Sequence, residues 1–292
     1  MINCSGRTSA FRAFALVVWH LRYDYLVMMI AVAVLLPTPE FDTAIATLSI
    51  LGIGASVFIG FRNSNAYSRW WEARTLWGSV VINARSLNNG LSAVRNGSSS
   101  MDAILDRMRR RQVRHAWQLS AELRGIDPVP GVAELTPEDP ESASATDLLN
   151  RQAKDVQALS STGHIDPQAR VMLMAANTGT VTAQSGLERI RNQPIPFLYR
   201  LFIRGLTWFF AIMAFARLDG GNHEWSDILV GFLLMATFIT AERIGYLIEQ
   251  PMRNSIFDLP LYRFCATITG DLLGASHPLA KPRDAANALV WM

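Results

Sequence analysis

The most prominent pattern along this chain is a set of long apolar segments. The clearest one covers residues 44–61, which are eighteen residues without a charged side chain. As a helix it would be roughly 27 Å long, close to the thickness of the hydrocarbon core of a membrane. Residues 25–39, 205–216 and 228–241 are also free of charge but shorter, and we interpret them as spanning helices packed in a bundle. The charges that flank the last two segments should then face away from lipid, namely Arg200, Arg204, Glu242 and Arg243.

Short connections join these segments in pairs. Residues 37–42 separate the first pair and residues 218–225 the second, so each pair is predicted to be a hairpin. Neither connection contains lysine or arginine, whereas sixteen basic residues lie between Arg62 and Arg191. Because basic residues are enriched on the cytoplasmic side, we expect both termini and the middle segment inside and both turns outside.

The middle segment has the apolar recurrence of helices rather than the alternation of strands. Residues 69–89, 101–124, 143–161 and 167–190 are predicted to be helical, with proline-containing breaks at 127–131 and 136–140. The chain is therefore predicted to be all-α. Its expected organisation is a first hairpin in residues 1–61, a helical cytoplasmic domain in 62–193, a second hairpin in 194–248 and an extended cytoplasmic tail in 249–292.

Composition supports a membrane protein and argues against an enzyme. Half of the residues are hydrophobic and 17% are charged, compared with about 25% charged in a typical soluble domain. The motifs of phosphate loops, zinc proteases and nucleophile elbows are missing, as are paired cysteines, so we expect no catalytic residue, cofactor or metal site. No nucleic-acid partner is expected either, because we interpret the basic cluster as a solvated face. Its members are Arg107, Arg109, Arg110, Arg111 and Arg114.

Within residues 44–61 the spacing of three large apolar residues defines one helical face. Ile53, Val57 and Phe61 recur every four residues, beside small residues such as Gly52 and Gly54 that permit close helix packing. Spacing alone favours packing against lipid or another helix. A pore lining would require several copies around an axis, which spacing does not supply.

A run of nineteen residues from Gly60 to Gly78, GFRNSNAYSRWWEARTLWG, closely resembles the signature of the bestrophin family. Weaker matches follow in the expected order at residues 194–199, 115–124 and 249–261. The resemblance implies a homopentameric channel with four spans per subunit, in the bacterial inner membrane, that conducts monovalent ions. It also places Ile53, Val57 and Phe61 in an apolar neck that acts as a hydrophobic gate. A second, cytosolic constriction is expected at Gln168 or, as the next choice, Ala169.

The resemblance also directs attention to the groups near the neck. Arg62, Asn63 and Asn65 are expected near its exit, where Arg62 would favour anions if it faced the axis. The alternatives are that Arg62 pairs with Glu72 or anchors at the interface. Anion conduction is slightly favoured over cation conduction, since the neck carries no formal charge and the edge of the Phe61 ring is weakly positive.

One departure from the family concerns calcium. Eukaryotic relatives hold calcium partly through a run of acidic residues, whereas only Asp258 is acidic in the corresponding residues 251–258. A calcium ion needs several oxygen ligands, so we expect no gating by calcium. Two other functional classes stay open: a transporter, and a membrane-anchored scaffold or sensor. A scaffold fits the composition but does not explain the match at residues 60–78.

Overall fold

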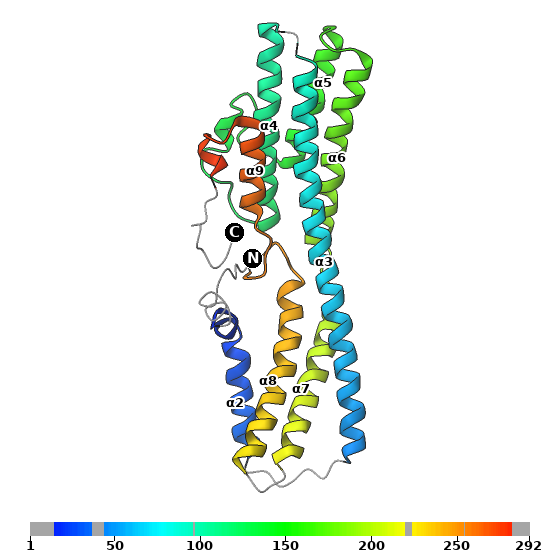
Figure 1. Ribbon diagram of the computed structural model, residues 1–292, viewed down its shortest axis with the longest axis vertical. Coiled ribbons are helices and arrows are strands. Elements are labelled where there is room, and N and C mark those ends of the chain that lie inside the picture. Colours follow the sequence, from blue (N-terminus) through cyan, green and yellow to red (C-terminus); the bar gives the residue numbers. More distant parts are fainter. Residues whose placement is uncertain (1–14, 37–43, 96, 220–223, 254, 282–292) are drawn as a thin grey trace. The chain divides into compact units, whose positions relative to one another are not determined.

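The structure is a computed structural model that describes residues 15–36, 44–95, 97–219, 224–253 and 255–281. All regular elements in these ranges are helical, which confirms the predicted fold class (Figure 1). A short helix at residues 15–20 precedes the others. The main helices are α2 (Arg22–Leu35), α3 (Ile45–Ala93), α4 (Ser99–Arg124), α5 (Ala145–Ser161), α6 (Pro167–Asn192), α7 (Phe197–Asp219), α8 (Trp225–Ile248) and α9 (Leu261–Leu273), with 3-10 turns η1 (Ala133–Leu135) and η2 (Pro278–Ala280).

Local sequence signals account for several helix ends. The Asp166 carboxylate accepts a hydrogen bond from the amide of Ala169 at 2.6 Å, and Pro167 occupies the first turn, where it needs no amide donor. Ser144 caps α5 in a reciprocal box with Asp147. The α4 helix is terminated by Gly125, whose φ of 66° is most readily adopted by glycine.

Three helices of the described residues are long and apolar enough to cross a membrane. They are α3, α7 over Phe197–Leu218, and α8. The first predicted span coincides with α2, which is described over 14 residues. The last residues of that span and the first predicted turn lie in 37–43, outside the described residues. Residues 220–223, half of the second predicted turn, are also outside them.

The chain divides into two compact units. The membrane unit contains the described residues from 15 to 70 and from 194 to 250, and the bundle unit contains those from 71 to 193 and from 251 to 281. The α3 helix contributes residues to both units, and the boundary predicted at residues 61 and 62 falls inside this single helix of 49 residues.

The membrane unit is held together by apolar contacts among α2, α3, α7 and α8. One cluster joins α2 to α7 and α8 through Met28, Phe215 and Met235. A second joins α3 to α7 and α8 around Ala55 and Phe210. Close approach depends on Gly52, since a Cβ atom there would lie 2.8 Å from the Phe210 ring. The predicted packing role is therefore confirmed for Gly52 but not for Gly54, where a Cβ atom would meet no other atom within 4 Å.

The bundle unit has its own core between α3, α4, α5 and α6 (Figure 1). Its C-terminal part is not the extended tail that we predicted, because α9 packs against α4. The indole of Trp117 donates a hydrogen bond to the Thr269 hydroxyl at 3.0 Å, and the rings of Trp77 and Phe264 stack 5.9 Å apart. The prolines in this region were interpreted as indicating extended structure. They lie before and after a thirteen-residue helix and do not interrupt it.

The interpretation of the basic cluster on α4 as a solvated face is also wrong for two of its five arginines. Arg111 is buried and binds Asp139 at 2.6 Å as well as Asp155. Arg114 is buried too, and it donates to the carbonyl oxygens of Thr136 and Pro140. A guanidinium group has five N–H donors and can therefore bind several loop oxygens at once. Arg111 and Arg114 therefore fix the loop between α4 and α5, while the other three arginines of the cluster are partly exposed.

A buried histidine makes the stability of the bundle unit depend on pH. His115 is fully buried, with Nε2 placed 2.9 Å from the side-chain oxygen of Gln184. Burial lowers the pKa of His115 from 6.5 to about 4. Between these values the unfolded chain binds a proton that the folded chain does not, so stability falls as the pH falls. We expect this residue to reduce the free energy of unfolding by about 3 kcal/mol across that window.

The measurement is denaturant unfolding of the detergent-solubilised protein at the two ends of the window. His115→Gln removes the titrating group and retains a polar partner for Gln184. We expect a smaller decrease in stability for this variant than for the unmodified chain. Equal decreases in both proteins would contradict the assignment.

Candidate functional site

The candidate neck residues form an exposed stripe on α3. The side chains of Ile53, Val57 and Phe61 are 66%, 48% and 64% exposed in the single chain. The opposite face of the same segment, which includes Ala55 and Ile59, is buried. At 3.6 residues per turn the centres of these two faces lie about 180° apart. The helix therefore presents a large apolar stripe away from its own subunit.

Arg62 follows the stripe directly but lies on the buried face. It is 1% exposed and pairs with Glu242, and its second terminal nitrogen lies 3.5 Å from Glu249. The predicted alternative that Arg62 pairs with Glu72 is wrong, because Glu72 instead accepts from Arg189. Position 62 is about 100° around the helix from Phe61, which turns its side chain toward α8.

The two asparagines expected near the exit have different surroundings. Asn63 is half-buried and donates a hydrogen bond to the carbonyl of Ala241 on α8 at 3.1 Å. This contact requires Gly245, where a Cβ atom would overlap the Asn63 amide. Asn65 is exposed. Of the three exit residues, Asn65 alone has its side chain exposed in this subunit.

A second ionic network lies within the membrane unit. The Asp24 carboxylate accepts hydrogen bonds from Arg204 at 2.9 Å and from Arg243 at 2.7 and 2.8 Å. Arg243 also lies 5.3 Å from the ring centre of Tyr246. The expectation that the charges on α7 and α8 face protein is confirmed for Glu242 and Arg243, whereas Arg204 pairs with Asp24 but leaves 43% of its side chain exposed.

Sequence reasoning missed three members of these networks: Asp24, Tyr246 and Glu249. The sequence does contain a pattern that could have identified the two carboxylates. An acidic residue beside an apolar segment, near arginines in other apolar segments, predicts ion pairing, because an unpaired charge within a membrane is costly. Which carboxylate meets which arginine does not follow from the sequence.

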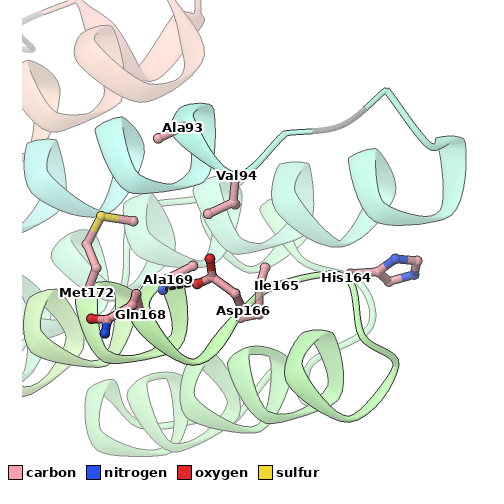
Figure 2. A pocket seen from close by; sticks show the side chains of 8 residues that line it. All are labelled: Ala93, Val94, His164, Ile165, Asp166, Gln168, Ala169 and Met172. Carbon is pink, nitrogen blue, oxygen red and sulfur yellow. Dashed lines mark hydrogen bonds between the residues drawn. The ribbon is translucent and has the colours of Figure 1, made fainter.

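The two residues expected at the cytosolic constriction line a cavity in the bundle unit (Figure 2). Its volume is about 550 Å³. Gln168 is exposed and Ala169 half-buried in the first turn of α6, opposite Val94, which directly follows α3 (Figure 2). Met172, one turn further along α6, also lines it. Gln168 and Ala169 therefore line the same cavity. That they form a constriction of the pore stays a prediction.

The region expected to have lost its calcium ligands is described except for residue 254. The Asp258 carboxylate accepts a hydrogen bond from the Ser255 hydroxyl at 2.8 Å. Among the residues that the structure describes, no group of three or more histidine, cysteine or acidic side chains lies close enough to hold a metal ion.

Comparison with known sequences identifies a family. A family model described as the bacterial and fungal bestrophin protein matches residues 10–273. A protein of Ralstonia nicotianae named as a voltage-dependent anion channel-forming protein is 30% identical over 262 residues. The matched region covers 83% of this chain and 81% of the Ralstonia protein. The similarly named protein YneE of Escherichia coli is 29% identical over 235 residues, covering 78% and 76%.

Solved structures show the same fold. A crystal structure of a bacterial bestrophin homologue from Klebsiella pneumoniae is 26% identical, with a TM-score of 0.74 and coverage of 93% of this chain and 97% of its own. A point variant of the Klebsiella homologue, also 26% identical, has a TM-score of 0.79 and coverage of 87% and 98%.

Proposed function

Because this chain belongs to the bacterial and fungal bestrophin family, we propose that it is the subunit of a homopentameric ion channel whose neck is lined by Ile53, Val57 and Phe61. The observation that carries this proposal is the exposed apolar stripe on α3, opposite a face that is buried within the subunit. Several copies arranged around an axis would bring these stripes together into an apolar constriction. Members of this family are channels and not enzymes, which agrees with the missing catalytic motifs.

We favour chloride over sodium as the permeant ion. The related proteins from Ralstonia and Escherichia are named as anion channel-forming proteins. Arg62 contributes little direct attraction, since it is buried between two glutamates. Selectivity then depends on the width of the neck, the cost of dehydration and the ring edges of Phe61. Gln168 and Ala169 are proposed to form the second constriction.

We place the channel in the bacterial inner membrane, with both termini and the bundle unit in the cytoplasm. The support is the concentration of basic residues between positions 62 and 191 and their absence from the two short turns. The partners are further copies of this chain, lipid and monovalent ions.

The test is the reversal potential of the purified protein in a planar bilayer under a salt gradient, with a large counter-ion replacing first chloride and then sodium. A potential near the chloride equilibrium value supports the anion channel. A potential near the sodium value identifies a cation channel of the same fold. If no current flows, the scaffold is favoured, and a flux at the slow turnover of a carrier indicates a transporter.

Calcium is expected to leave the channel open probability unchanged. The segment at 251–258 offers one carboxylate, and Asp258 is engaged by Ser255, whereas calcium sites use six to eight oxygen ligands. Calcium titration of the reconstituted channel is the measurement. A steep increase in open probability at micromolar calcium would refute this prediction.

A further inference from the structure

We propose that the membrane unit has a binding site for the phosphate group of an anionic phospholipid. The site is a cavity of about 370 Å³ between α3, α7 and α8. Four arginines and one carboxylate line it together with three apolar or aromatic side chains. Its lining consists of Arg62, Phe197, Arg200, Leu201, Arg204, Glu242, Arg243 and Tyr246.

The ion pairs around the cavity leave one arginine in excess. Arg62 pairs with both Glu242 and Glu249, and Asp24 is shared between Arg204 and Arg243. The four arginines of the lining thus meet three carboxylates, which leaves the cavity with a single surplus positive charge. A phosphodiester carries one negative charge, so it matches this surplus.

Among the four arginines of the lining, Arg200 is the one that no carboxylate reaches within the described part of the chain. It lies 5.8 Å from the ring centre of Tyr246 and 6.0 Å from that of Phe197, and its buried Nε has no hydrogen-bond partner there. A buried donor without an acceptor is unfavourable. The planar guanidinium is well suited to bind two phosphate oxygens at once.

The apolar part of the lining favours a lipid over a free anion. Phe197 and Leu201 are 65% and 53% exposed, and they lie on α7 within one turn of Arg200. A phosphate bound at Arg200 therefore has an apolar surface beside it that can contact the glycerol and the start of the acyl chains. Basic pockets between membrane helices are used in this way for lipid headgroups.

The experiment is native mass spectrometry of the delipidated full-length protein in detergent, titrated with dioleoyl phosphatidylglycerol or dioleoyl phosphatidylcholine. We expect about one tightly bound phosphatidylglycerol per subunit and weaker binding of phosphatidylcholine, whose choline is repelled by the arginines. Arg200→Gln should weaken phosphatidylglycerol binding about tenfold or more, the effect of losing a charge-assisted hydrogen bond. Arg200→Lys, which keeps the charge without the planar fork, should have an intermediate affinity.

Arg217→Gln is the matched control, since it removes the same charge from the other end of α7. Its affinity for phosphatidylglycerol should stay within about twofold of the affinity of the unmodified protein, a much smaller change than the roughly tenfold weakening expected for Arg200→Gln. Inorganic phosphate is titrated as a competitor. If it binds with the same dependence on Arg200 while the lipid does not bind, the lipid assignment is overturned. Equal weakening by Arg200→Gln and Arg217→Gln, or loss of the oligomer in Arg200→Gln with and without lipid, would also overturn it.

Discussion

Shortening Ile53 or Val57 to alanine is expected to raise the single-channel conductance severalfold. Either change removes apolar bulk from the exposed stripe of α3 and widens or hydrates the proposed neck. Each reduction of about 1.4 kcal/mol in a permeation barrier multiplies the rate about tenfold. The measurement is single-channel recording of each variant in planar bilayers under symmetrical chloride.

The controls for these variants are Ile30→Ala on α2 and Val230→Ala on α8. Their side chains are 56% and 54% exposed, and neither belongs to α3. They reproduce each truncation outside the stripe and should leave the conductance unchanged. Unchanged currents in both Ile53→Ala and Val57→Ala would exclude these residues from the neck, and the stripe would then be a surface for lipid or for another helix.

Replacing Arg62 by methionine is expected to destabilise the subunit by about 3–5 kcal/mol. The change leaves Glu242 and Glu249 buried without the guanidinium that they share. Removing one partner of a buried ion pair is costly because the remaining charge is neither solvated nor compensated. For a protein of this size the decrease in Tm should be about 6–20 °C in detergent.

Two variants separate this effect from a general loss of charge. Arg85→Gln disrupts an exposed ion pair with Asp271 and should cost at most about 1 kcal/mol. The triple variant Arg62→Met, Glu242→Leu, Glu249→Leu removes the whole network and should recover most of the lost stability, as replacement of buried ion pairs by apolar groups often does. The interpretation fails if Arg62→Met lowers Tm no more than Arg85→Gln.

The sequence by itself determined the helical class, the position of most helices and the family. Apolar recurrence placed α4, α5 and α6 within about two residues of their observed bounds, and a charge-free segment marked each helix of the membrane unit. These features are local, since they depend on side chains a few residues apart along one helix. The face that carries Ile53, Val57 and Phe61 was determined in the same way.

Tertiary structure decided where the charges go. The basic cluster of α4 was interpreted as solvated, yet Arg111 and Arg114 are buried in contacts with residues 19 or more positions away. The partner of Arg62 is 180 residues distant rather than ten. The segment around α9 was predicted to be an extended tail because prolines flank it on both sides. Its packing against Trp117 follows only from the tertiary structure.

The physical reason is the same in each case. A helix specifies from its own sequence which residues share a face, but not which other helix covers that face. A buried charge requires a partner, and any of several carboxylates along the chain satisfies that requirement equally well in the sequence. Packing of α3 against α8 selects Glu242 and Glu249 for Arg62, and packing of α2 against α8 brings Asp24 to Arg243.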